Sequence, residues 1–538
     1  VCRLLQFPFL RRDHNCDVSW HAINFHDQAD IYGGQVNKYP GAVEAFQKVN
    51  LFRWLEFMKS LFPEEYDFFP RTWLLPQQFS EFASEVRTMQ EKKCKHKPVF
   101  IVKPSEGSQG EGIYLLRDPQ HYTGGNGRSH VVQEYLSSVL LLERFKFDLR
   151  IYVILKCLDP LEFHICKEGL ARFSTIPYEQ PNNKNLAETF MHLTNYSLNK
   201  KSSDFKISDK EEEGSKRKLT AVLGQLSRLG HDTELLWTRV EQLVAKTLIA
   251  LVGELKVEMQ AAVPAGKPGP TCFHILGFDV LIMKNLTPML LEVNSNPSLS
   301  ITEEHETATG GVEYLISAKD EDVKRKLVRD TLILVAPKNK YTRKSNSKKD
   351  LQGRVTNDRL PSVFLKAGDR AVESIVMAAE QDEDGGEVTG PPRPLPFDLS
   401  LLDSSDEEEE EEESCLKEIF PAVYGELYEE QRIVERLADI FIACLGVKGC
   451  LRLGPTMFRL FARKCRLNRK GITNAAIDIL YIDMQRRWEY MNPDRTSGLG
   501  FLGFVSACYE IARRRFYAPT KQEMLKSLVE FCQANIKL

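Results

Sequence analysis

Several features that mark whole classes of protein are missing from this sequence. Its 12 cysteines are scattered and form no CxxC pair, a usage that favours reduced thiols in a cytosolic protein and speaks against a zinc site. No apolar run approaches the roughly 18 residues that span a bilayer, so we expect no membrane contact. The chain also lacks an initial methionine, and we expect it to be a fragment whose native amino terminus, with any targeting signal, is missing.

The composition is that of an ordinary globular chain whose charges are unevenly spread. Of its 538 residues, 42% are hydrophobic and 27% are charged, and the net charge is -3. This length allows roughly two to four domains. Composition divides the chain into an N-terminal α/β part (1–97), a central sheet (98–181), a part in which helices join (182–338), a disordered acidic linker (339–414) and a basic, all-helical domain (415–538). We expect the first three to form one compact body of α/β (α+β) class.

The segment "GFDVLIMKNLTPMLLEVNSNPS" predicts a hairpin of two apolar strands that carry oxygen ligands. Glu292 and Asn294 are two residues apart and share one strand face, and the hairpin brings Asp279 beside them. Two carboxylates and an amide oxygen suit Mg²⁺, which completes its shell with water and nucleotide phosphates. The alternative is a pair of ordinary carboxylates at strand ends, but three ligand groups at this spacing favour the metal.

A glycine-rich turn in "IVKPSEGSQGEGIYLL" offers a cradle for phosphate. Gly107, Gly110 and Gly112 let backbone N–H groups approach phosphate oxygens, and Lys103 supplies a point charge. Because the lysine precedes the glycines, this is not a P-loop, and an ordinary flexible turn explains the glycines equally well. Downstream, "VVQEYL" is either a hinge along an adenine or a buried strand.

Charged residues alternate in "KFDLRIYV", where Lys146, Asp148 and Arg150 share one strand face. In a phosphate-binding cleft this row offers cations to the phosphates and a carboxylate to the ribose; otherwise it is a solvated face. "HLTNYS" adds hydroxyl and amide groups. Arg172 and Lys216 are isolated cations, and each by itself is typical of a surface charge.

The order of these motifs is more specific than any one of them. Taken together, "KPSEGSQGEGI", "QEYL", "KFDLR", "KEGLARF", "MHLTNYS", "GSKRKL", "ILGFDVL" and "LLEVNSNPS" resemble the tubulin tyrosine ligase-like family, a branch of the ATP-grasp ligases. The resemblance covers most of residues 1–335, and "SQGEGI" and "NYSLNK" are similar to its glutamate-adding branch. It implies an ATP-grasp-like ligase core and a separate helical domain, whose "LGPTMFRLF" and "DILYIDMQRRW" resemble one member in particular.

The resemblance also implies roles for individual residues of this sequence. ATP contacts fall on Lys103, Gln109, Gly110, Gln133, Glu134, Tyr135, Leu136, Lys146, Phe147, Asp148, Thr194 and Asn195. Magnesium ligands fall on Asp279, Glu292 and Asn294, and contacts to the incoming glutamate fall on Arg172, Tyr196, Ser197 and Lys216. The implied catalytic residues are Lys103, Arg172 and Glu292. Glu106 and Glu111 depart from a phosphate-binding loop, because acidic groups are unfavourable there unless they point outward.

The implied reaction is ATP-dependent ligation with Mg²⁺ as cofactor. A carboxylate in a tubulin C-terminal tail attacks the γ-phosphate of ATP to give an acylphosphate, and the amino group of free L-glutamate then displaces phosphate. Two cations, Arg172 and Lys216, fit the two carboxylates of glutamate better than the single one of glycine or tyrosine. The alternatives are a glycine or tyrosine ligase of the same family and a catalytically silent microtubule-binding relative, although the intact metal and lysine positions argue against silence.

The final domain is basic. From Ser414 onward it holds 20 Lys and Arg against 13 Asp and Glu, and one cluster contains no intervening acid: Arg459, Arg463, Lys464, Arg466, Arg469 and Lys470. Such a face suits the acidic surface of microtubules; the alternatives are a solvated face or a nucleic-acid site, for which no reading motif is present. We expect a monomer in the cytoplasm and on the cytoskeleton, with the cilium or basal body as a further location.

Two further segments allow more than one interpretation. "MNPDRTSGLG" resembles a calcium loop, but Val505 stands where its closing glutamate is expected, which argues against calcium. The run from Asp406 to Glu413 resembles a tubulin tail in composition. It is either a solvated spacer or a segment that competes for the active site or becomes glutamylated itself.

Overall fold

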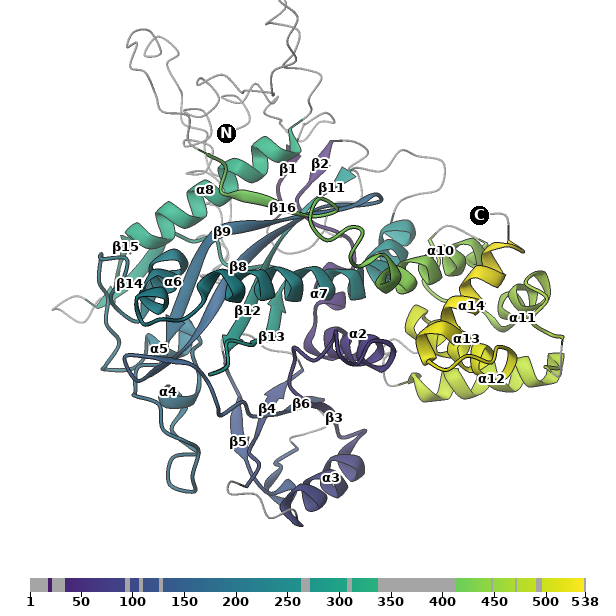
Figure 1. The fold of residues 1–538 in the computed structure, drawn as a ribbon, viewed down its shortest axis with the longest axis horizontal. Helices are drawn as coiled ribbons and strands as arrows, with labels where there is room; N and C mark the ends of the chain where they lie inside the picture. Colours follow the sequence, from purple (N-terminus) through teal and green to yellow (C-terminus); the bar gives the residue numbers. More distant parts are fainter. Residues whose placement is uncertain are drawn as a thin grey trace, which may run out of the picture.

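Two antiparallel sheets and one long helix organise the part of the chain that the structure describes (Figure 1). The structure, a computed structural model, describes residues 18–21, 34–91, 97–105, 110–124, 129–262, 271–306, 312–336, 413–446, 449–469, 472–489 and 496–536. Within these ranges no helix combines the length and the apolar character that crossing a bilayer requires.

The larger sheet has seven strands. Its order is β10-β9-β8-β12-β13, with β7 beside β8 and β16 beside β9. The strands are β7 (Leu141–Leu142), β8 (Phe145–Leu158), β9 (Leu161–Phe173), β10 (Lys216–Lys218), β12 (His274–Ile282), β13 (Pro288–Asn294) and β16 (Leu416–Phe420). Two small sheets lie outside it: β1 (Val18–Ser19), β2 (Gln35–Val36) and β11 (Thr271–Cys272), and the hairpin of β14 (Thr302–Glu306) and β15 (Val312–Ile316).

Alternation along β8 explains how the larger sheet is buried on both faces. Ile151 and Val153 belong to the core that contains α7 (Thr233–Ala262), whereas Tyr152 and Ile154 pack with α8 (Ala318–Val335) on the opposite face. The charged row of β8 continues this second face toward the start of the strand. Along this face, β8 is therefore charged near its start and apolar farther on. The charged part does not belong to the core that packs against α8.

The smaller sheet has the order β3-β6-β4-β5. Its strands are β3 (Thr72–Leu75), β4 (Phe100–Pro104), β5 (Tyr114–Leu116) and β6 (His130–Glu134). Helix α3 (Phe79–Glu91) covers one face, where the Phe82 ring contacts Trp73 and Phe100 at 5.2 and 5.0 Å between centroids. The other helices before residue 230 are α1 (Ala42–Ala45), α2 (Lys48–Leu61), η2 (Pro119–His121), α4 (Thr189–His192), α5 (Tyr196–Asn199) and α6 (Leu219–Arg228).

Helices fill the last part of the chain after the short strand β16. They are η6 (Glu429–Arg432), α10 (Ile433–Leu445), α11 (Pro455–Lys464), α12 (Asn474–Arg487), α13 (Phe501–Arg515) and α14 (Lys521–Gln533). Two helix–loop–helix units, α10–α11 and α12–α13, are joined by reciprocal backbone hydrogen bonds of 2.9 Å between Leu453 and Leu499. The tail packs directly on the rest of the chain, since a Cβ at Gly253 of α7 would meet the Val434 carbonyl oxygen of α10 at 2.9 Å.

The predicted fold class is confirmed, and the helices and strands read from the sequence are present, but their grouping differs. Strand β3 precedes residue 98 yet shares a sheet with β4 and β6, and the larger sheet joins β8 and β9 to β12 and β13. The final segment also opens with a strand, β16, that pairs with β9. Composition reports local pattern, whereas these pairings are non-local. The predicted acidic linker lies outside the described residues apart from Glu413 and Ser414.

Candidate active site

A cleft lies where the two large sheets meet. It holds about 620 Å³ of empty space, part of which is open to solvent. Its lining includes most of the residues that the sequence predicts to contact ATP and magnesium: Lys103, Gln133, Glu134, Tyr135, Leu136, Lys146, Asp148, Thr194, Asn195, Asp279 and Glu292. Apolar side chains complete the lining, among them Ile101, Leu281 and Leu291. The mixed lining suits a ligand with one flat apolar part and one charged part.

Lys103 reaches the cleft from β4. Its ammonium group donates to Oε1 of Gln133 on the neighbouring strand at 2.7 Å, and Gln133 in turn donates to the Thr72 hydroxyl at 3.1 Å. Both side chains are buried. Burial lowers the pKa of Lys103 to about 8, because removal from water disfavours the charged form.

Lys146 lies at the centre of a second buried network. Its ammonium group donates to the Tyr135 hydroxyl at 3.1 Å and to the His192 carbonyl oxygen at 2.9 Å. The Tyr135 hydroxyl lies 3.0 Å from Nδ1 of His192, while Nε2 lies 2.9 Å from the Asn185 carbonyl oxygen. Nε2 therefore holds the proton and Nδ1 accepts. Burial lowers the pKa of Lys146 to about 7 and that of His192 to about 4, so the imidazole is neutral.

Four charged side chains form an ion-pair row across β9, β8 and β12. Arg172 donates to both carboxylate oxygens of Asp148, at 2.8 and 2.6 Å, and lies 2.7 Å from Asp279. Arg150 completes the row by donating to Asp279 at 2.6 and 3.2 Å. Burial raises the pKa of Asp148, whereas Arg150 and Arg172 outweigh burial at Asp279 and hold its pKa well below the usual range. Two cations and two anions leave the row neutral.

The predicted hairpin is present, and it brings Asp279 beside Glu292. β12 and β13 pair so that Asp279 lies opposite Glu292 and Gly277 lies opposite Asn294. The Asn294 amide donates to Asp279 at 3.4 Å, and Glu292 lies 3.5 Å from the Lys48 ammonium group. Arg150 donates to Asp279 twice, and Arg172 and Asn294 donate once each, so the about four lone-pair sites of this carboxylate are engaged in the free protein. Asp279 can bind a metal ion only if one of these donors gives way. The donor set fits Mg²⁺, and its role stays a prediction.

The glycine-rich turn is described only in part. Gln109 and Gly107 lie outside the described residues. Gly110 and Gly112 have φ values of +83° and +70°, in the left-handed region that favours glycine. The space beside Gly110 is bounded by the Asn195 side chain, 3.4 Å from where a Cβ would stand. The turn therefore approaches the same segment that lines the cleft.

The residues predicted to hold the incoming glutamate lie beside the cleft on neighbouring elements. Lys216 on β10 pairs in register with Arg172 on β9. The Lys216 ammonium group lies 4.6 Å from the centre of the Tyr196 ring, and Ser197 follows on the same helix, α5. Both cations are already paired: Arg172 with the two aspartates, and Lys216 with Asp320 and Glu303. Their role toward glutamate stays a prediction.

The lining of the cleft differs from the prediction at two residues, Phe147 and His192. The Phe147 side chain, one position out of phase with Lys146 and Asp148, points to the opposite face of β8, where it stacks on Phe173 in the core. It does not line the cleft. His192 lines the cleft but was not predicted; the available signal is its place in "MHLTNYS".

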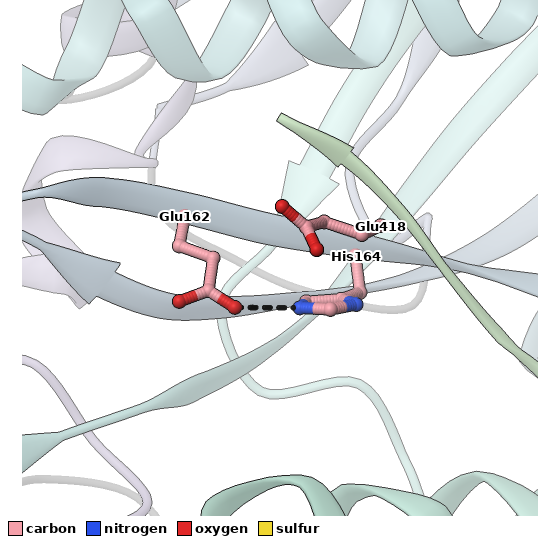
Figure 2. A group of neighbouring side chains, drawn as sticks. All are labelled: Glu162, His164 and Glu418. Atoms are coloured by element: carbon pink, nitrogen blue, oxygen red, sulfur yellow. Dashed lines mark hydrogen bonds and ion pairs between the residues drawn. The ribbon is translucent and has the colours of Figure 1, made fainter. Parts of the chain in front are cut away.

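A separate group of potential metal ligands lies on β9 and β16, ten residues along β9 from Arg172. Figure 2 shows Glu162, His164 and Glu418, whose ligand atoms lie within 4.8 Å of one another. His164 is directly opposite Glu418 in the register, and Glu162 shares its strand face. The Lys156 ammonium group lies 2.6 Å from Glu162 and supplies the positive charge that this group needs. We assign no ion there.

Two family models match this chain, one over the part that contains the two large sheets and one over the helical tail. The family model "Tubulin-tyrosine ligase family" matches residues 27–309. The chain belongs to this family. The mouse protein named tubulin polyglutamylase TTLL11 is 45% identical over 100% of this chain and 74% of its own length. The human protein of that name is 43% identical over 99% of this chain and 71% of its own, and the Caenorhabditis elegans protein ttll-11 is 30% identical over 99% and 70%.

The tail of this tubulin-tyrosine ligase family member has a match of its own. A family model described as "Tubulin polyglutamylase TTLL11, EF-hand" covers residues 417–538, which agrees with the paired helix–loop–helix units and with the predicted resemblance of the tail to the eleventh member of the series. This architecture was not predicted, because the first loop, "GVKGCLRLG", contains no carboxylate. The prediction against calcium stays a prediction.

The basic cluster of the tail is divided by one ion pair. Arg459 on α11 donates to both oxygens of Asp478 on α12, at 2.9 and 2.7 Å, and is thereby neutralised. Arg463, Lys464, Arg466 and Arg469 are exposed, while Lys470 lies outside the described residues. The cluster that can meet an acidic partner is therefore smaller than the sequence indicates.

Proposed function

We propose that this chain is an ATP-dependent tubulin polyglutamylase that joins free glutamate to glutamate side chains, or to side-chain branches, in tubulin C-terminal tails. Three matched relatives bear that name. The observation that carries the proposal is a pair of buried lysines, Lys103 and Lys146, whose hydrogen-bond partners among the described residues are neutral oxygens. Nearby carboxylates, Glu292 and Asp279 at Lys103 and Asp148 at Lys146, offset only part of the cost of burying these cations. A triphosphate would supply further negative charge.

Different residues of the cleft bind different parts of ATP. Lys103 and Lys146 direct their ammonium groups to the phosphates, and apolar side chains such as Ile101 and Leu281 exclude water around the base. Asp279, Glu292 and Asn294 would hold the magnesium ion, which when bound neutralises charge on the phosphates. Arg150 and Arg172 keep Asp279 ionised, and therefore able to act as a ligand.

The reaction has two steps. A carboxylate oxygen of the acceptor glutamate forms a bond to the γ-phosphorus of ATP, the bond to ADP breaks, and an acylphosphate results. The amino nitrogen of free glutamate then attacks the acyl carbon, an amide bond forms, inorganic phosphate leaves and the amine loses a proton. Lys103 stabilises the negative charge that develops during the first step.

The incoming glutamate is recognised by its two carboxylates. Arg172 and Lys216 provide the two cations, and Tyr196 and Ser197 provide hydroxyl groups on the adjoining helix α5. In the free protein the Nε and Nη2 groups of Arg172 bind carboxylates, and these bonds leave Nη1 as the guanidinium nitrogen for the incoming glutamate. Glycine and tyrosine lack the second carboxylate and satisfy only one cation.

Substrate docking uses the exposed cations of the tail. Arg463, Lys464 and Arg466 present positive charge to the acidic microtubule surface, and the attraction weakens as salt screens it. The protein acts as a monomer in the cytoplasm and on the cytoskeleton, including the cilium and basal body.

Incubation with microtubules, Mg-ATP and one labelled amino acid at a time tests this proposal. We expect incorporation of glutamate into tubulin and none of glycine or tyrosine. Incorporation of glycine or tyrosine alone would overturn the substrate, and microtubule binding without any incorporation would favour a silent relative.

A further inference from the structure

The Lys216 ammonium group is held by two carboxylates that come from different elements. Asp320 lies on α8 and Glu303 on the β14–β15 hairpin, and both contact Lys216. All three side chains are buried. Burial lowers the pKa of Lys216, but the two carboxylates outweigh it and raise the pKa above its ordinary value.

The two carboxylates differ in how firmly they are held. Asp320 is also bound by Lys324 at 2.8 Å, one helical turn along α8, and Lys324 donates in turn to the Ser300 carbonyl oxygen. Glu303 belongs to a hairpin that forms its own two-stranded sheet and does not join the seven-stranded one. Among the described residues, Lys216 is the one ion-pair partner of Glu303. Asp320 is thus the fixed partner and Glu303 the exchangeable one.

Apart from Glu303, the charged side chains around Lys216 carry more positive than negative charge, which leaves room for one more anion. Lys216 and Lys324 share the single carboxylate of Asp320, and Lys319 lies beside them, so positive charge is then in excess. In the free protein Glu303 reduces that excess. A glutamate side chain is also what the incoming amino acid presents, with the same carboxylate on the same length of chain.

We propose that Glu303 occupies the position at Lys216 that a carboxylate of the incoming glutamate takes, so that the two compete and Glu303 sets the affinity of the enzyme for its amino-acid substrate. This inference rests on the proposed function. Displacement of Glu303 frees the β14 end of the hairpin, whereas Asp320 keeps Lys216 in position beside Tyr196.

Steady-state kinetics of the Glu303→Gln variant of the full chain test the competition. Glutamine keeps the shape of the side chain and removes its charge, so we expect the KM for glutamate to fall on the order of tenfold while the KM for ATP stays unchanged. Glu313→Gln is the matched control, because Glu313 is an exposed carboxylate on the other strand of the same hairpin. We expect no change in that variant.

The outcomes separate the inference from the proposed function. An unchanged or higher KM for glutamate in Glu303→Gln, with an active wild type, would show that Glu303 holds Lys216 in place and would overturn the competition alone. A wild type that incorporates no glutamate would overturn the proposed function itself. A lower KM in Glu303→Gln with an intermediate value in Glu303→Asp would support the competition, since a shorter acid competes less well.

Discussion

Lys103 and Lys146 show most clearly how single residues prepare the cleft for an anion. A lysine in the interior normally pairs with a carboxylate, but these two donate to an amide oxygen, a phenol and a backbone carbonyl. The nearby carboxylate of Asp148 is already engaged by Arg172. The pKa values of both lysines are lowered by burial, to about 8 and about 7. In the free protein, burial of these two cations therefore costs free energy. A phosphate ligand would offset this cost by pairing with them.

Proton uptake on ATP binding follows from these pKa values. At pH 8, Lys103 is deprotonated in about half of the free protein molecules and Lys146 in most of them. The negative charge of a bound triphosphate favours the protonated form of both lysines. Calorimetry of ATP binding in buffers of different ionisation enthalpy should show uptake of roughly one proton at pH 8 and little at pH 6. Affinity should fall as pH rises through this range. Equal heats in all buffers at pH 8 would contradict the account.

Arg172 is a structural residue as well as a candidate ligand. Its removal leaves Asp148 buried without an arginine and Asp279 with one arginine instead of two. Breaking such a buried pair costs about 3–5 kcal/mol, and Arg172→Ala should lower the free energy of unfolding by that amount in urea titrations. Loss of activity in this variant therefore does not by itself assign a role toward glutamate. An unchanged stability would show that the ion-pair row is not formed.

At the scale of elements, the hairpin and the strand faces could be predicted, but their partners could not. Alternation placed Asp279, Glu292 and Asn294 together because strand side chains repeat every two residues. Phe147 was assigned to the site by motif position, although the same alternation turns it into the core. Strand β16 has five residues and pairs with a strand about 250 positions earlier, so no local pattern indicates it. The contact of Glu303 with Lys216 is equally non-local.

Helix α7 carries a carboxyl group whose protonation should change stability. Glu254 lies between α2 and the tail, and burial together with Glu258 raises its pKa to about 8. A raised pKa means that the folded state keeps a proton which the unfolded state loses above pH 4.5, so this contribution to stability falls as pH rises toward 8. Glu254→Gln should raise the unfolding free energy on the order of 1 kcal/mol at pH 8 and change it little at pH 5.

Thermal unfolding of that variant and of wild type at the two pH values would measure the difference. Glu254 is only partly buried, which is why the expected gain is modest. Glu234→Gln, near the exposed start of α7, is the control and should show no pH-dependent gain. A variant less stable than wild type at pH 8 would mean that the ionised carboxylate is the favoured form.

At the scale of the whole molecule, one hydrophobic core includes both the ligase half and the tail. It contains α7, Trp54 of α2 and Phe501 of α13, whose rings lie 5.3 Å apart between centroids. Ion pairs such as Lys256 with Asp439, at 2.6 Å, add to the contact. The sequence indicated two separate units because an acidic linker divides them, but linker composition does not reveal whether the flanking parts pack together.

The proposed docking of the basic tail on microtubules should depend on salt. Replacement of Arg463 and Lys464 by glutamate should weaken microtubule binding roughly tenfold at low ionic strength, with the difference shrinking as salt is added. Arg513→Glu is the matched control, because Arg513 is already paired with Glu510 at 2.8 Å. Cosedimentation at increasing salt measures both. Equal binding by the double variant and wild type at low salt would remove this face from substrate docking.

The most direct test of the central claim is ATP-dependent incorporation of labelled glutamate into microtubules by Glu292→Gln. The change removes one ligand charge opposite Asp279 with little change in volume. We predict a loss of at least roughly 100-fold in incorporation, with a thermal unfolding midpoint close to that of wild type. Full incorporation by a folded Glu292→Gln protein would contradict a magnesium-dependent ligase site at this hairpin.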